Sequence, residues 1–151
     1  MIEVVLMRAA LEIAAPQIAP EIRDRYAFDI AQAVDDVETG FAVVATAEAE
    51  STFDTDIEHC ICKPWQCDQG KAAGLYQLHA RWYDGYSQAQ ICESNPLSTS
   101  LAVRALTQLR RITGSWEAAF ARYRGAMKAG DPHVLRRVRL FQRLQRSVPV
   151  S

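Results

Sequence analysis

The four cysteines of this chain, Cys60, Cys62, Cys67 and Cys92, all lie within one third of its length. An even, clustered set in a small domain predicts two disulfides in an oxidising compartment. Cys60 and Cys62 rarely bond each other, because an extended chain points alternate side chains apart. Two pairings remain: Cys60–Cys67 with Cys62–Cys92, or Cys62–Cys67 with Cys60–Cys92. Either long bridge closes a loop of about 30 residues, worth roughly 3–4 kcal/mol.

A structural zinc site is the alternative use of these cysteines. Zinc sites are typically built from paired C-x2-C motifs. Here a C-x-C-x4-C run is followed after a long gap by a single cysteine. The spacing therefore favours disulfides, and we expect neither a metal nor another cofactor.

The length of 151 residues and a hydrophobic content of 49% predict one globular domain over residues 1–151. Apolar residues recur at helical spacing along most of the chain. Two helices are predicted to start at Pro20 and at Ser115. Three more are predicted over about residues 37–51, 99–112 and 132–146, and Ser98 is the expected cap of the helix over 99–112. Residues 52–73 break the pattern and predict a loop with a small strand pair. The expected fold class is mainly α (α+β), a helical domain with a small irregular or β lobe tied by disulfides.

The sequence contains no membrane span and no intact signal peptide by the usual criteria. No stretch of about 18 uncharged apolar residues occurs. Glu3 precedes the first basic residue, and Glu12 interrupts the N-terminal apolar run, whereas a secretory signal has a basic start and an uncharged core. Disulfides without such a signal fit a processed protein or one released by another route, such as a phage lysis protein.

The net charge of −1 hides a strong asymmetry. Residues 1–62 hold three Arg against thirteen Asp and Glu, a net of −10, and residues 63–151 hold fourteen Lys and Arg against five acids, a net of +9. Either the two halves neutralise each other within one fold, or the basic half faces a polyanion whose attraction weakens with salt.

A nucleic-acid partner is not expected, although the last predicted helix is rich in arginine. That helix also has an apolar stripe that should pack inward, and no DNA-binding motif occurs. The stripe consists of Leu135, Val138, Phe141 and Leu144, opposite Arg136, Arg137, Arg139, Arg143 and Arg146.

A candidate catalytic acid, Glu50, ends the apolar helix predicted over residues 37–51. The unpaired carbonyls at a helix C-terminus disfavour a carboxylate, and burial acts in the same direction, so a raised pKa is expected. A carboxyl group that stays protonated near neutral pH can donate a proton to a leaving oxygen. Glu48 competes for this role. Because residues two apart point to roughly opposite sides of a helix, only one of the two can face a cleft.

Two further segments suggest a site for sugars. Small residues over 70–79 allow a backbone turn to approach a ligand, and Gln77 can donate to and accept from hydroxyl and acetamide groups. Tyr123, near the end of another predicted helix, can pack its ring against a sugar and offer its hydroxyl. Aromatic residues that could stack on sugar rings gather between these segments: Trp65, Tyr76, Trp82, Tyr83 and Tyr86.

The order and spacing of these segments resemble the soluble lytic transglycosylases and the related goose-type lysozymes of the lysozyme-like superfamily. Glu50-Ser51 with Phe53 matches the family's helix ending in Glu-Ser followed by an aromatic residue. Residues 74–77, Gly-Leu-Tyr-Gln, match the family's Gly-Leu-Met-Gln turn, with Tyr76 in the Met place.

The third match is partial. Residues 123–125, Tyr-Arg-Gly, correspond to the family's Tyr-Asn-Ala-Gly segment, but Arg124 stands where Asn is usual and an Ala is missing. The resemblance covers about residues 40–126, and the cysteine-rich insert, residues 58–68, lies outside the family pattern.

The resemblance implies cleavage of the β-1,4 bond between N-acetylmuramic acid and N-acetylglucosamine, with Glu50 as the catalytic acid. It also implies that Gln77, Tyr123 and Tyr76 bind the glycan. Glycosidases commonly use a second carboxylate, and Asp68 is preferred over Asp54 and Asp56. With a second carboxylate across the cleft the enzyme would be an inverting hydrolase. Without one, the muramic acid N-acetyl group would assist, and 1,6-anhydro products would form.

The expected partner is therefore the peptidoglycan glycan strand, attacked by a monomer in the periplasm or outside the cell. Two other classes fit the same features. One is a catalytically inactive cell-wall-binding or phage structural module of the same fold, and the other is a glycosidase acting on chitin or chitosan.

Overall fold

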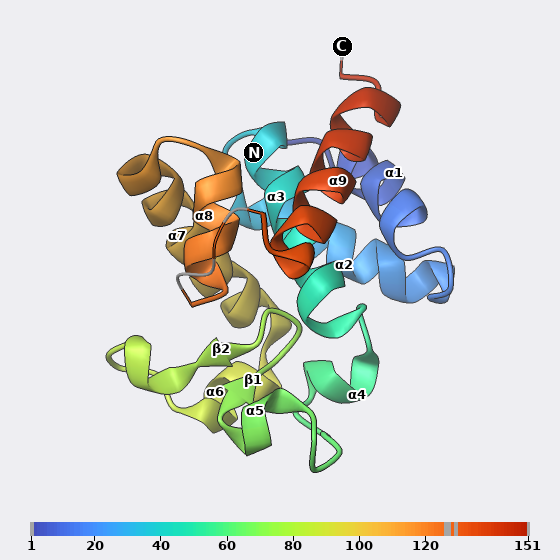
Figure 1. Cartoon of the computed structure of the whole chain (residues 1–151). Helices are drawn as coiled ribbons and strands as arrows, with labels where there is room; N and C mark the ends of the chain where they lie inside the picture. The colour runs from blue at the N-terminus through green and yellow to red at the C-terminus, as the bar shows by residue number, and fades with distance from the viewer. Residues whose placement is uncertain (1, 126–127, 129, 151) are drawn as a thin grey trace.

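The computed structural model describes residues 2–125, 128 and 130–150. Long helices form one lobe, and short helices with a pair of strands form a smaller lobe beside it (Figure 1). The long helices are α1 (Val4–Ala14), α2 (Pro20–Ala33), α3 (Val37–Ser51), α7 (Asn95–Thr113), α8 (Trp116–Tyr123) and α9 (Pro132–Ser147). The predicted class, mainly α with a small β lobe, is confirmed. Within the described residues, no helix has the length and apolar composition to cross a bilayer.

Helix α3 lies at the centre of the helical lobe and contacts α1, α2, α7 and α9. Every residue from Thr39 to Ala47 is buried, and many are small, which lets neighbouring helices approach closely. Asp36 caps its start, because the Asp36 side chain accepts from the Thr39 backbone N–H at 2.7 Å. The helix ends at Ser51, because the next residue, Thr52, has a left-handed backbone conformation. Glu50 therefore lies in the last turn, where the helix leaves the core.

Helix α7 begins earlier than predicted. The cap is Ser94, whose hydroxyl accepts from the Leu97 backbone N–H at 3.2 Å, and not Ser98. Pro96 lies in the first turn, where its missing N–H costs nothing. Ser98 is instead buried inside the helix.

Helix α9 buries a different stripe from the one predicted. Val134, Arg137, Phe141 and Leu144 are buried, whereas Leu135 and Val138 are only half-buried. The buried residues follow the three- and four-residue spacing of one helix face. The polarity of Arg137 masked this register in the sequence, because an arginine on an inward face is rare unless it is paired.

The small lobe is built from α4 (Thr55–Glu58), α5 (Cys67–Gly70), β1 (Ala72–Ala73), β2 (Leu78–His79), the 3-10 helix η1 (Ala80–Trp82) and α6 (Gln88–Glu93). The two strands are antiparallel, with Ala72 opposite His79 and Ala73 opposite Leu78. Strand β1 lies at the end of the loop predicted over residues 52–73, and strand β2 lies beyond it. The segment α5 is a left-handed turn, since Cys67, Asp68, Gln69 and Gly70 all have positive φ.

Two disulfides tie this lobe together, as predicted. Of the two pairings left open by the sequence, the structure has Cys60–Cys92 and Cys62–Cys67. All four cysteines are thus bonded, which removes the thiolates that a zinc site would need.

Loss of the longer disulfide is expected to have the larger effect on stability. The double variant Cys60→Ser/Cys92→Ser should lose about 3–4 kcal/mol of unfolding free energy, because that bridge constrains the longer loop of the unfolded chain. The variant Cys62→Ser/Cys67→Ser should lose roughly 2 kcal/mol by the same argument. Thermal melting of both variants, beside the oxidised and reduced parent, measures the difference. A parent protein whose Tm is unchanged by reductant would contradict this expectation.

Candidate active site

A cleft of about 930 Å³ is lined by residues of both lobes. The helical lobe contributes the end of α3, one face of α7 and the end of α8, and the small lobe contributes α5, β2 and η1. A cleft of this size can hold a ligand of several sugar or peptide units.

Glu50 lines this cleft, and its side chain is only 11% exposed. Glu48 is not part of the described lining, and its carboxylate instead contacts the guanidinium of Arg136 on α9 at 2.5 Å. The helix thus directs the two carboxyl groups differently, as their spacing predicts, and it is Glu50 that faces the cleft.

The Glu50 carboxylate forms an ion pair with Arg137 of α9. Arg137 is buried, and its other terminal nitrogen donates to the carbonyl of His133 at 3.1 Å. Burial raises the pKa of Glu50 and outweighs the opposing charges of Arg137 and Arg124. Glu50 is therefore a buried carboxyl group that binds its proton more tightly than usual and has a cation in contact with its ionised form.

Gln77 also lines the cleft, at the end of a tight turn over residues 74–77. Its side-chain amide donates to the Gly74 carbonyl at 3.0 Å and contacts the Cys67 sulfur at 3.6 Å. Gly74 has φ +73°, and a Cβ there would lie 2.8 Å from the Ser98 hydroxyl oxygen. Glycine is therefore needed both for the backbone angle and for the close approach of α7.

Tyr123 lines the same cleft, and its hydroxyl donates to the Tyr76 backbone carbonyl at 2.7 Å. Burial raises the pKa of Tyr123, and the neighbouring Glu50 charge acts in the same direction, so the phenol stays protonated. The hydrogen bond ties the end of α8 to the turn that positions Gln77.

The structure does not support Tyr76 as a sugar-binding residue. Its ring is buried, and its hydroxyl shares a hydrogen bond of 3.1 Å with the Thr99 hydroxyl. The Tyr76 side chain packs into the core, and its backbone carbonyl accepts the hydrogen bond from Tyr123. Tyr76 therefore supports the site from behind.

Asp68 is the other carboxylate among the described residues that line the cleft. It is exposed, and one carboxylate oxygen lies 3.5 Å from the His79 imidazole. His79 stacks on Trp82 with ring centroids 4.8 Å apart. Asp54, by contrast, caps α4 by accepting from the backbone N–H groups of Asp56 and Ile57. Of the three aspartates considered, Asp68 is the one that lines the cleft.

Strained backbone gathers around this cleft. Thr52, Cys67, Asp68 and Gln77 line it and all have φ near +50°. A left-handed conformation costs a residue with a side chain about 1–2 kcal/mol. Such residues concentrate at functional sites, where the surrounding structure holds them in place. The disulfide at Cys67 and the hydrogen bonds of Gln77 provide that support.

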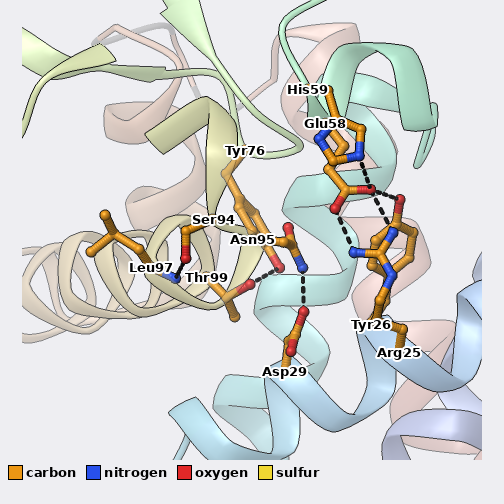
Figure 2. A network of polar contacts seen from close by, with 10 residues as sticks. All are labelled: Arg25, Tyr26, Asp29, Glu58, His59, Tyr76, Ser94, Asn95, Leu97 and Thr99. Carbon is orange, nitrogen blue, oxygen red and sulfur yellow. Dashed lines mark hydrogen bonds and ion pairs between the residues drawn. The ribbon is translucent and has the colours of Figure 1, made fainter. Parts of the chain in front are cut away.

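A largely buried network of polar contacts joins α2, α4 and α7 (Figure 2). Glu58 of α4 accepts two hydrogen bonds from the Arg25 guanidinium, at 2.5 and 2.7 Å, and one from the Tyr26 hydroxyl at 2.6 Å. Asn95, at the start of α7, donates to Asp29 of α2 at 2.6 Å. These contacts join α2 to the small lobe and to α7, so they help to fix the position of the small lobe relative to the helical lobe.

The two carboxyl groups of this network have opposite pKa shifts. Burial opposes ionisation of Glu58, but the hydrogen bonds from Arg25 and Tyr26 outweigh it and lower the Glu58 pKa. Burial raises the pKa of Asp29, and the hydrogen bond from Asn95 only partly offsets it. Glu58 is thus held ionised, while Asp29 is a costly charge to bury.

Several residues in the cleft lining or in contact with it were not singled out from the sequence. Arg137 was assigned to the solvent face of its helix, although it shares the register of Val134 and Phe141. Arg104 had no recognisable motif around it, and Arg122 directly precedes the matched segment 123–125 without being part of the match. Among the aromatic residues noted in the sequence, Trp65, Trp82 and Tyr83 line the cleft, whereas Tyr86 is not part of the described lining.

Comparison of the chain with protein-family models, with curated proteins and with solved structures finds no significant match. Within the described residues, no group of three or more His, Cys, Asp or Glu side chains is arranged to hold a metal ion.

Proposed function

We propose that this protein is a glycosidase that cleaves the β-1,4 bond between N-acetylmuramic acid and N-acetylglucosamine in peptidoglycan. The observation that carries the proposal is the convergence of Glu50, Gln77 and Tyr123 on one cleft. These residues come from three segments that lie far apart in the sequence and that the resemblance groups into one glycan-cleaving site. A shared lining is what that grouping requires.

In the proposed reaction Glu50 donates its proton to the glycosidic oxygen as the bond to the sugar breaks. Burial favours the protonated form that this step requires. Once the proton has left, the Arg137 guanidinium stabilises the carboxylate. In the route that forms 1,6-anhydro ends, Glu50 then accepts the proton of the attacking 6-hydroxyl of the muramic acid and returns to its starting state. In the hydrolytic route the second carboxylate takes the proton of the attacking water, and Glu50 regains its proton from solvent.

Asp68 is the proposed second carboxylate, which would activate a water molecule from the small-lobe side of the cleft. That route gives hydrated reducing ends. If the muramic acid N-acetyl group takes the place of this carboxylate, the products end in 1,6-anhydro sugars. Gln77 and Trp82 are proposed to bind acetamide and sugar-ring surfaces. The disulfides suit a place of action on the cell wall, outside the reducing cytoplasm.

The proposal is tested by the turbidity of a suspension of purified bacterial cell walls. The oxidised protein is expected to clear the suspension. A protein that binds the walls without clearing them or releasing soluble fragments would instead be a wall-binding module. Cleavage of chitin oligomers in place of cell walls would point to a chitin-acting enzyme.

Replacing Arg137 by glutamine is expected to move the pH dependence of cleavage to higher pH. Without the Arg137 charge the ionised form of Glu50 loses its partner, so the Glu50 pKa rises further above its usual range. Activity that requires protonated Glu50 falls as pH rises through that pKa, so the alkaline limb should shift upward. The measurement is kcat/KM against pH at a temperature below the Tm of each variant. Arg137→Lys, which retains a cation, should stay close to the parent profile, and an unshifted or acid-shifted limb in Arg137→Gln would contradict the assignment.

A further inference from the structure

Three arginines line the cleft on the side of the helical lobe: Arg104 of α7, and Arg122 and Arg124 at the end of α8. All three are exposed. Within the part of the chain that the structure describes, none of their guanidinium groups forms an ion pair or a hydrogen bond. Elsewhere in the structure Arg8, Arg25, Arg136 and Arg137 are each paired with a carboxylate. We call these three residues the arginine wall.

The acidic groups of the cleft do not neutralise the arginine wall. Glu50 is already in contact with Arg137, and Asp68 lies beside His79 in the small lobe. The partial negative charge at the C-terminus of α8 stabilises nearby cations, which accounts in part for the presence of Arg122 and Arg124 there. Arg104 lies in the middle of α7, where no such effect applies. The cleft therefore has an excess of positive charge on one wall, and a charged cleft concentrates field and attracts ions of the opposite sign.

We propose that the arginine wall binds carboxylates carried on the muramic acid residues of the glycan, an inference that rests on the proposed function. A guanidinium binds a carboxylate through two parallel hydrogen bonds, which gives orientation as well as attraction. Peptidoglycan offers such groups in two places: on the peptide side chains, and on the lactyl group once the peptide has been removed. Chitin oligomers have the same backbone linkage without either carboxylate, so the wall sets specificity for acidic over neutral strands.

The test compares two double variants. The wall variant is Arg104→Gln/Arg122→Gln, and the control variant is Arg139→Gln/Arg143→Gln. Arg124 is left in place because its charge also acts on Glu50. The control removes the same charge from exposed positions on α9 that are not part of the described cleft lining. Each protein is titrated with soluble peptide-bearing strands, with amidase-treated strands whose lactyl carboxylates are free, and with neutral chitin oligomers. Dissociation constants are measured by calorimetry at low and high salt, separately from the rate of cleavage.

The wall variant is expected to bind at least one type of acidic strand about tenfold more weakly than the control, with a smaller salt dependence. Its affinity for chitin oligomers should match the control. A larger loss on peptide-bearing strands assigns the wall to peptide carboxylates, and a larger loss on amidase-treated strands assigns it to the lactyl group. Equal affinity of the two variants for both acidic strands, or an equal loss on all three ligands, would overturn the inference, as would failure of the parent to bind either acidic strand.

The binding and cleavage measurements separate this inference from the proposed function. A parent protein that binds acidic strands through the arginine wall without cutting them would refute the proposed reaction and leave the wall assigned. A parent that cuts peptidoglycan, while the wall variant binds and cuts as the control does, would refute the wall alone.

Discussion

Replacing Glu50 by glutamine is expected to reduce cleavage of peptidoglycan by about 10²–10⁴-fold, the usual contribution of a general acid. The amide retains the size and one acceptor of the carboxyl group but has no proton of suitable acidity to donate. The rate of release of soluble glycan fragments from purified walls measures the effect.

Glu48→Gln is the matched control, since it makes the same chemical change two residues earlier on the same helix. Glu48 is not part of the described cleft lining and contacts Arg136 on α9. This variant should retain the parent rate within a few-fold, about the cost of an exposed ion pair. The Tm of each variant shows whether it is folded. A folded Glu50→Gln protein that clears walls at the parent rate would rule out Glu50 as the catalytic acid.

Replacing Glu58 by alanine is expected to cause a clear loss of stability without touching the cleft lining. The variant leaves the buried Tyr26 hydroxyl without its acceptor and Arg25 without its partner. The Tyr26 hydroxyl is buried but Arg25 is half-exposed and regains water, so the expected cost is about 2 kcal/mol, which for a chain of this size lowers the Tm by roughly 6 °C. Thermal melting at pH 7 measures the loss.

The pH dependence of this effect has a defined sign. Because the folded Glu58 pKa lies below the unfolded value, the stability from ionised Glu58 is fully present above the unfolded pKa. It is lost as the pH falls through the folded pKa. The difference in unfolding free energy between parent and Glu58→Ala should therefore shrink below about pH 4. A difference that grows in acid would contradict the ionised assignment.

Asp29→Asn is the control within the same network. Burial raises the Asp29 pKa, so the ionised carboxylate destabilises the fold at neutral pH. The amide oxygen of asparagine can still accept from Asn95, which now donates to Asp29 at 2.6 Å. This variant should therefore keep or slightly raise the Tm at pH 7, in contrast to Glu58→Ala.

Local signals in the sequence were sufficient for much of the fold. The helix over 37–51 and the caps at Ser115 and Asp131 were predicted because capping residues and apolar spacing agree there. The cap of α7 was assigned one turn too late, because Ser94 and Ser98 are both suitable capping residues. The pairing of the cysteines depends on how the small lobe folds back on α6, which spacing alone does not determine.

The candidate site was predictable only where a residue belonged to the ordered set of segments that resembles one family. Glu50, Gln77 and Tyr123 were selected in this way, and all three line the cleft. Arg137 was not, because its role depends on the packing of α9 against the end of α3, two segments far apart in the chain. Tyr76 was placed incorrectly, since an aromatic residue in a turn has the same sequence signature whether it faces the core or a ligand.

The most direct test of the proposed reaction is mass spectrometry of the fragments that the oxidised protein releases from purified peptidoglycan. Cleavage at the proposed bond yields disaccharide-peptide fragments with muramic acid at the new end, either hydrated or as the 1,6-anhydro sugar. A hydrated end supports Asp68 as the second carboxylate, and an anhydro end supports assistance by the N-acetyl group. Release of free peptides, of fragments ending in N-acetylglucosamine, or of no fragments at all would contradict the assignment of this cleft as a muramidase site.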